Sequence, residues 1–416
     1  ASVESVKFRC RRLKSGWERN KPAVVNLRLA WVRLARRIDR HNLPFYFSPC
    51  LNLAPNFFHT RKLGVMSFNE QQEHAMRRAL ELAQRGPIKG VNPRVGAVLI
   101  TPSGEIVGEG WHRGSGTDHA EVAALKDLQE NARGAANGPI AAGLTAVVTL
   151  EPCNHTGKTG PCALALIEAG VAKVIYASSD AGINSAGGAA TLRAAGIEVE
   201  SGLLQAEADE VIRVWATATA QQRPFVTLKY GTTLDGRSAA ADGSSKWITG
   251  PEARRDVHLR RTQIDAILVG TGTVIADDPE LTARQLDGSL YEEQPLRVIL
   301  GETELDPAAR IFDESDGKAK TVQLRTRDLN SALLSLFSMG VRHLMVEGGA
   351  MVASEFVRHN LVNEYLIYMA PKLLGGPITS LGNIGVSSID QAKELDFAEI
   401  KQLGPDLVIR ATERKN

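Results

Sequence analysis

The sequence predicts an α/β protein built from two domains. Apolar runs typical of strands alternate with segments of helical period along most of the chain. The 416 residues are too many for one ordinary core, and a hydrophobic share of 43% is ample for globular packing. Gln221-Gln222-Arg223-Pro224 is the expected boundary, so we expect one domain over 67–212 and a second over 222–416.

Periodicity places the elements of the first domain. Apolar residues recur with helical spacing from Ala75 to Ala83, and Gly86 ends that helix. Ser103-Gly104 is a turn signal between two strands. Helices are expected at 73–84, 121–130 and 162–168, and strands at 95–100, from 106, at 145–150 and at 171–177. Strands that alternate with helices imply a three-layer αβα domain.

The second domain shows the same alternation. Strands are expected at 225–229, 266–270, 296–300, 341–346 and 365–369, and helices at 251–262 and 351–358. Thr249 is expected to cap the helix from 251. Gly348-Gly349 stands between a strand and a helix, an arrangement that presents backbone N–H groups to phosphate. Because glycine pairs after strands are more often simple turns, this pattern indicates a nucleotide-like ligand and no more.

Charge is unevenly distributed along the chain. Residues 1–65 hold 14 Lys and Arg against three acids, a net charge of +11, whereas the whole chain carries +2. The remainder is therefore acidic, at −9, and nothing in it suggests a nucleic-acid groove.

The basic segment 1–65 is expected to lie outside the functional protein, as upstream sequence or a disordered extension. Met66-Ser67-Phe68-Asn69-Glu70 resembles the start of a protein. An organelle-targeting segment is one alternative, since the stretch is rich in Arg and poor in acids, although it is not rich in Ser. A nucleic-acid-binding tail is the other. We expect a chain without 1–65 to keep its activity.

Cysteine and hydropathy patterns bear on the compartment. Four cysteines in 416 residues form no disulfide framework, and two of them stand in a metal-like pattern, which predicts a reducing cytoplasm. No run of 18 uncharged apolar residues occurs, so no membrane span is expected.

One His and two Cys form a candidate zinc site. His119-Ala120-Glu121 is followed by Pro152-Cys153 and Pro161-Cys162, each near the expected end of a helix or strand. Three protein ligands are typical of a catalytic zinc, whose open position holds the reacting water. An imidazole and two thiolates would let zinc lower the pKa of that water, and Glu121 could accept its proton and return it to a departing amine. The pattern predicts a hydrolytic deaminase of an amino-substituted heteroaromatic ring.

A structural zinc site is the main alternative interpretation. His155 lies between the two cysteines and could be a fourth ligand. Glu121 has no role in such a site, whereas replacing it would leave zinc in place but abolish turnover if the site is catalytic.

Three segments of the first domain are distinctive: 92–97, 119–122 and 149–162. They resemble the deaminase half of bifunctional bacterial riboflavin biosynthesis proteins. Eight residues separate the two cysteines, with a His-Thr-Gly-Lys-Thr filler similar to that family, whereas most cytidine deaminases have two. The resemblance implies a cytidine-deaminase-like αβα fold, zinc held by His119, Cys153 and Cys162, and proton transfer by Glu121. The implied substrate is a pyrimidine ribotide, 2,5-diamino-6-ribosylamino-4(3H)-pyrimidinone 5′-phosphate, which loses its 2-amino group.

The second domain resembles the riboflavin-pathway reductase, whose fold is similar to dihydrofolate reductase, through 229–236, 245–249, 273–279, 281–284, 347–349 and 370–376. The resemblance implies NADPH lined by Gly231, Trp247, Thr273, Asp277, Gly349, Ala350, Met351, Val352, Ala353, Ser354 and Glu355. It implies a substrate site lined by Ser245, Arg261, Leu281, Arg284 and Glu347, with Lys229 polarising the sugar. The guanidinium groups of Arg261 and Arg284 suit a ribose 5′-phosphate, because they can form paired charge-assisted hydrogen bonds.

We therefore expect a bifunctional enzyme that deaminates the pyrimidine with zinc, then reduces the ribosyl chain to ribityl with NADPH, and forms a homo-oligomer. A deaminase of a free base or of tRNA, fused to an unrelated pterin reductase, is an alternative; the cysteine spacing and the two arginines argue against it. A zinc-stabilised nucleic-acid-binding protein is the non-enzyme alternative. The acidic body and the placement of Glu121 argue against that one.

Overall fold

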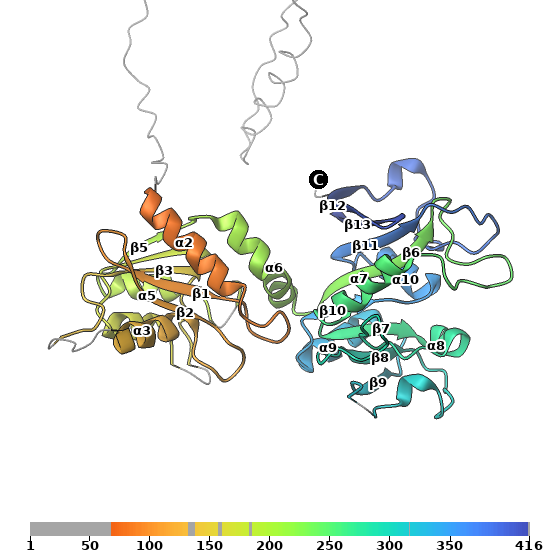
Figure 1. The fold of residues 1–416 in the computed structure, drawn as a ribbon, viewed down its shortest axis with the longest axis horizontal. Helices are drawn as coiled ribbons and strands as arrows, with labels where there is room; N and C mark the ends of the chain where they lie inside the picture. Colours follow the sequence, from red (N-terminus) through yellow and green to blue (C-terminus); the bar gives the residue numbers. More distant parts are fainter. Residues whose placement is uncertain (1–67, 132–137, 157–159, 183–184, 316, 415–416) are drawn as a thin grey trace, which may run out of the picture. The chain divides into compact units, whose positions relative to one another are not determined.

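The computed structural model describes residues 68–131, 138–156, 160–182, 185–315 and 317–414 (Figure 1). The basic segment 1–65, and our expectations for it, lie outside the described residues. No helix within the described ranges is long and apolar enough to cross a membrane.

A five-stranded mixed sheet in the order β2-β1-β3-β4-β5 is the centre of the first domain. β1 pairs antiparallel with β2 and β3, whereas β3, β4 and β5 run parallel. The strands are β1 (Gly96–Ile100), β2 (Ile106–Trp111), β3 (Thr145–Leu150), β4 (Lys173–Ser178) and β5 (Glu198–Ser201). All five residues of β1 are buried, as expected for a strand covered on both faces.

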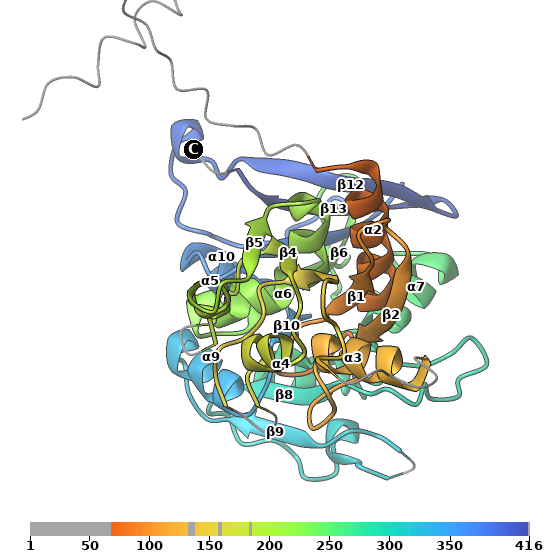
Figure 2. The same cartoon turned by 90° about the vertical axis from the view of Figure 1, so that its left-hand side faces the viewer.

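Helices cover both faces of this sheet, which confirms the three-layer prediction (Figures 1 and 2). Val98, Val147 and Ile175 pack with α2 and α6, whereas Leu99 and Val148 pack with α3, α4 and α5. The helices are α2 (Glu70–Ala83), α3 (Ala120–Asn131), α4 (Cys162–Glu168), α5 (Gly188–Ala194) and α6 (Gln205–Gln221).

The expected elements of the first domain are present, with two differences. α2 begins three residues earlier than expected, because Asn69 and Gln72 form a capping box. α5, β5 and α6 were not expected; β5 has only four residues, too few for periodicity to reveal.

An eight-stranded sheet forms the second domain, in the order β12-β13-β11-β6-β10-β7-β8-β9. The strands from β11 to β9 are parallel, whereas β12 and β13 pair antiparallel at one edge. The strands are β6 (Phe225–Thr233), β7 (Ala266–Gly270), β8 (Leu296–Leu300), β9 (Thr321–Leu324), β10 (His343–Val346), β11 (Glu364–Ala370), β12 (Leu395–Leu403) and β13 (Asp406–Glu413).

Two pairs of helices cover this sheet. α9 (Leu329–Ser338) and α10 (Ala350–Arg358) share one core cluster with the strands, and α7 (Pro251–Arg261) and α8 (Thr271–Asp277) share another. The expected cap of α7 is wrong. Gly250, not Thr249, is the N-cap residue, and its N–H donates to Oδ2 of Asp406 at 2.6 Å. Gly250 has no side chain to cap the helix, and the carboxylate of Asp406 from β13 instead holds the backbone of this N-cap residue.

Candidate functional sites

The fold brings the three predicted zinc ligands together. His119 directly precedes α3, Cys153 follows β3, and Cys162 is the first residue of α4. Nδ1 of His119 lies 3.2 Å from Sγ of Cys162 and 3.5 Å from Sγ of Cys153. Among the described residues these three side chains form a metal-type group, with their ligand atoms all within 4.8 Å of one another. One imidazole and two thiolates are a donor set that zinc favours, and three protein ligands leave a position open.

The thiols of Cys153 and Cys162 shift each other's pKa in opposite directions. A hydrogen bond from Cys162 lowers the pKa of Cys153 to about 4, and the same contact, together with burial, raises the pKa of Cys162. The backbone N–H of Cys162 also points at Sγ of Cys153, at 3.4 Å. Zinc binding requires both thiolates, so it would be coupled to proton release.

Glu121 lies in the first turn of α3, two residues after His119. Its side chain is 4% exposed, and burial raises the pKa of the carboxyl group. A carboxyl group with a raised pKa, next to a metal-type cluster, is suited to passing a proton in both directions.

His112 is a residue of this site that the sequence reasoning missed. Its Nε2 lies 2.9 Å from Nδ2 of Asn92, and its Nδ1 lies 3.1 Å from the carbonyl of Asp118. Since an amide nitrogen only donates, Nε2 accepts and Nδ1–H donates to the carbonyl. Burial lowers the pKa of His112, which favours this neutral form. The ring meets that of His119 edge to face, with centroids 5.4 Å apart.

His155 does not join the ligand group, as the structural-zinc alternative would require. The described metal-type group consists of His119, Cys153 and Cys162. Nδ1 of His155 is instead buried without a hydrogen-bond partner. The geometry therefore favours three ligands and an open position over a closed four-ligand site.

A close backbone contact fixes the loop that carries Cys153. A Cβ at Gly188 would come within 1.8 Å of the carbonyl oxygen of Pro152, so this position accepts no side chain without movement. The N–H of Asn154 donates to the carbonyl of Ser185 at 2.8 Å. The segment before α5 thus supports the ligand loop directly.

The second domain contains a cavity of about 530 Å³, which we call the Lys229 cavity. Lys229 lies on β6, and Glu347 follows β10, which pairs in parallel with β6. Most of the predicted reductase residues line this cavity: Lys229, Gly231, Ser245, Trp247, Arg261, Asp277, Arg284, Glu347, Gly349 and Ala350. Leu281 is not among the lining residues, because its side chain is buried in the core cluster of α7 and α8.

Glu347 is the electrostatic centre of the Lys229 cavity. Its Oε1 lies 3.0 Å from Nζ of Lys229, and its Oε2 pairs with the guanidinium of Arg261. Burial opposes ionisation, but these two cations overcome it and lower the pKa of Glu347 to about 2. Arg261 also donates to the carbonyl of Thr282 at 2.8 Å. Arg284 is more exposed and pairs with Glu280 at 2.6 Å.

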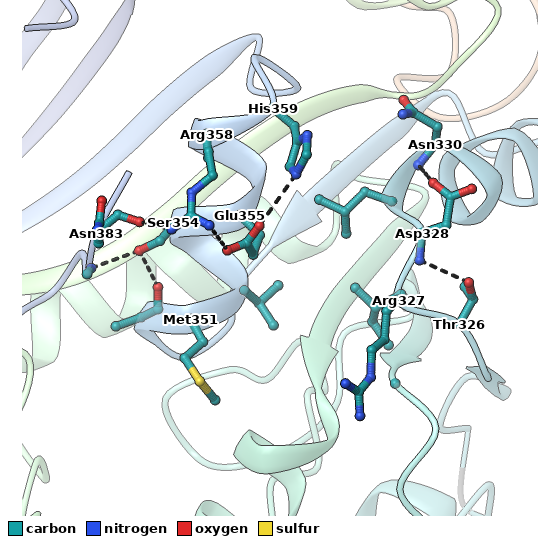
Figure 3. Close-up of a pocket in the computed structure, with 16 residues that line it drawn as sticks. Thr326, Arg327, Asp328, Asn330, Met351, Ser354, Glu355, Arg358, His359 and Asn383 are labelled. Carbon is teal, nitrogen blue, oxygen red and sulfur yellow. Dashed lines mark hydrogen bonds and ion pairs between the residues drawn. The ribbon is translucent and has the colours of Figure 1, made fainter. Parts of the chain in front are cut away.

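A second cavity, of about 700 Å³, lies along α10, and we call it the Arg327 cavity (Figure 3). Four of the predicted cofactor residues line it: Met351, Val352, Ser354 and Glu355. Ala350 lines both cavities. Ala353 is buried in the core, and Thr273 accepts a hydrogen bond from the N–H of Gly349 at 3.1 Å.

The shared edge of the two cavities suits a dinucleotide. Gly349 is the N-cap of α10, and no side chain caps this end of the helix. Backbone N–H groups in the first turn of α10 can therefore donate hydrogen bonds to a pyrophosphate. A Cβ at Gly349 would meet Oγ1 of Thr273 at 3.4 Å, an ordinary van der Waals distance. The residues at the N-terminus of α10 thus fit a dinucleotide such as NADPH, which their backbone N–H groups would hold by its phosphates.

Two family models match the chain. The cytidine and deoxycytidylate deaminase zinc-binding region matches residues 69–178, and the RibD C-terminal domain matches residues 224–409. The riboflavin biosynthesis protein RibD of Mycobacterium tuberculosis is 45% identical over 346 residues, which cover 82% of this chain and 97% of that protein. The chain belongs to the RibD family.

Other RibD proteins agree with this assignment. RibD of Escherichia coli is 39% identical over 371 residues, covering 82% of this chain and 98% of that protein. The structure of Acinetobacter baumannii RibD superposes with a TM-score of 0.73 at 36% identity, covering 83% of this chain and 99% of that one. This RibD-family chain is a bifunctional deaminase and reductase of riboflavin biosynthesis, as the sequence predicted. Zinc belongs to the deaminase half and NADPH to the reductase half.

Proposed function

We propose that the first domain removes the 2-amino group of 2,5-diamino-6-ribosylamino-4(3H)-pyrimidinone 5′-phosphate by hydrolysis, and that the second reduces the ribosyl chain of the product to ribityl. The deaminase assignment rests on one observation: His119, Cys153 and Cys162 come together beside the buried Glu121. A solved Thermotoga maritima relative, 32% identical with a TM-score of 0.70, is described as a diaminohydroxyphosphoribosylaminopyrimidine deaminase and 5-amino-6-(5-phosphoribosylamino)uracil reductase, which supports the choice of substrate.

In the deaminase, His119, Cys153 and Cys162 would hold zinc. When bound, zinc would supply the Lewis acidity that lets water act as a nucleophile near neutral pH. Glu121 takes a proton from the attacking water and returns it to the departing nitrogen, so that a C–O bond forms, the C–N bond breaks and ammonia leaves. His112, fixed by Asn92 and Asp118, positions the ring of His119.

In the reductase, NADPH would lie across the N-terminus of α10 and supply the reducing equivalents. Lys229 donates a hydrogen bond that polarises the sugar at the carbon that is reduced, while Glu347 holds that ammonium in place. Arg284 and Arg261 bind the 5′-phosphate. Arg284, the more exposed of the two, makes the direct contact, while Arg261 adds its charge from the wall of the cavity.

We further propose the domain bounds, the cellular compartment and the oligomeric state. The domains span 67–212 and 222–416, and the protein acts in the cytoplasm as a homo-oligomer. Two free thiols as ligands support a reducing compartment. Light scattering on the zinc-loaded chain measures the oligomeric state.

A two-stage assay tests the function. The diaminopyrimidine ribotide is given to the zinc-loaded chain without NADPH, and NADPH is then added. We expect ammonia release in the first stage and NADPH oxidation in the second. Chain stripped of zinc is the control, and it should oxidise NADPH only when given the deaminated product. Oxidation of NADPH on the diamino substrate without any ammonia release would refute the deaminase assignment.

A further inference from the structure

The Arg327 cavity is bordered by an exposed ion pair. Arg327 follows β9, and its Nε lies 3.4 Å from Oε2 of Glu302. The side chains are 85% and 59% exposed. An exposed pair of this kind contributes little in water, so the guanidinium can exchange its partner at low cost.

The other charged side chains that line this cavity are already engaged. Arg358 pairs with Glu355 at 2.9 Å and donates to a backbone carbonyl at 2.6 Å, and His359 lies 3.5 Å from the same carboxylate. Asp328 caps α9 (Figure 3). Among the described lining residues, Arg327 is therefore the cation best placed to bind a new anion.

Arg327 and Glu302 also lie at a position where open α/β sheets contact the ribose of a bound nucleotide. Glu302 comes two residues after β8 ends, and Arg327 three residues after β9 ends. Nucleotides bind outside the carboxyl ends of parallel strands. There, an acidic side chain accepts from the ribose 2′-hydroxyl in NAD sites, and an arginine accommodates the 2′-phosphate in NADP sites. This chain places both kinds of side chain together.

We propose that Arg327, assisted by the hydroxyl of Thr326, binds the 2′-phosphate of NADPH, and that Glu302 competes with that phosphate for the guanidinium. The inference rests on the NADPH site proposed above. Oγ1 of Thr326 accepts from the N–H of Asp328 at 3.0 Å, which leaves its proton for a phosphate oxygen. Guanidinium and phosphate form paired charge-assisted hydrogen bonds, whereas the carboxylate repels the phosphate. The balance between these two residues sets the preference for NADPH over NADH.

Calorimetric titration of the full zinc-loaded chain with 2′,5′-ADP and with 5′-AMP tests this, because the two ligands differ by the 2′-phosphate alone. Arg327→Gln should weaken 2′,5′-ADP binding by roughly tenfold or more and 5′-AMP binding by less than about twofold. Glu302→Gln should tighten 2′,5′-ADP binding without tightening 5′-AMP binding. Arg325→Gln, which removes an exposed arginine that does not line the cavity, is the matched control and should change neither.

The outcomes separate the two proposals. Equal losses for both ligands in Arg327→Gln, or no loss for either, would overturn the role of Arg327 while leaving the NADPH site in place. Failure of the unmodified chain to bind either ligand would overturn the NADPH site and this inference with it. Circular dichroism and urea unfolding of each variant report that the second domain has folded.

Discussion

Nζ of Lys229 and Oε1 of Glu347 form a 3.0 Å ion pair in the wall of the Lys229 cavity. Both side chains are largely buried, and Arg261 holds the second carboxylate oxygen. The three groups carry a net charge of +1 in a place with little water to screen it. The pair therefore fixes the ammonium in position and leaves a positive field for a phosphorylated substrate.

Neutralising the carboxylate should disable the reductase alone. Glu347→Gln leaves Lys229 and Arg261 as two buried cations without a counter-charge, which costs about 3–5 kcal/mol in comparable buried pairs. We expect NADPH turnover to fall by about a hundredfold or more while ammonia release persists. Parallel assays of both steps, with urea unfolding, measure this. Glu73→Gln, which breaks an exposed pair with Arg77, should change stability by less than about 1 kcal/mol. Unchanged NADPH turnover in Glu347→Gln would contradict the role given to the pair.

Replacing Glu121 should abolish deaminase turnover without affecting zinc binding. Glu121→Gln keeps the shape of the side chain but cannot carry a proton, so ammonia release should fall by roughly 10²- to 10⁴-fold. Zinc content, measured by mass spectrometry of the protein solution, should stay at that of the unmodified chain, because Glu121 is not in the ligand group. If the variant lost zinc as well as activity, Glu121 would be needed for zinc binding and not for proton transfer alone.

Gly188 offers a test of how the ligand loop is supported. A methyl group in Gly188→Ala would collide with the carbonyl of Pro152, next to Cys153, and should push that ligand away. We expect weaker zinc binding, measured by competition with a chromophoric chelator. Gly160→Ala lies in the loop between the cysteines and meets nothing within 4 Å, so its zinc affinity should not change. If both variants bound zinc equally well, the contact between 188 and 152 would have no part in holding the site.

The metal-type group of His119, Cys153 and Cys162 could be predicted because its residues stand in short contiguous motifs near the ends of elements that the apolar pattern reveals. Cys153 follows a strand of six residues and Cys162 begins a helix, so local signals place both. His112 could not be found this way. Its position depends on an edge-to-face contact with His119 and a hydrogen bond from Asn92, and no spacing in the sequence encodes either.

The Lys229 cavity shows the same limit. Lys229 and Glu347 are far apart in sequence and meet because β6 and β10 pair in parallel with Val346 opposite Leu228. Strand order and register depend on packing of the whole sheet, which periodicity does not report. β12 was missed for a related reason. It is an edge strand whose residues are mostly exposed, so it lacks the apolar signal that revealed the buried strands.

His343 should make the protein less stable in mild acid. Its Nε2 lies 2.9 Å from Oγ1 of Thr227, and its ring meets Phe225 edge to face. Burial, and then the charge of Arg213, lower the pKa of His343 to about 3. An unfolded histidine has a pKa of about 6.5, so between pH 6.5 and 3 the unfolded chain binds a proton that the folded chain does not. Stability from this group is therefore complete above pH 6.5 and declines as the pH falls, by at most about 1.4 kcal/mol per pH unit. The free energy of unfolding in urea at pH 7.5 and pH 5.0 measures the decline, and His343→Gln should show a smaller one. Zinc loss in acid affects both proteins alike and cancels in the comparison, so identical pH dependence in the two would show that His343 is not the group responsible.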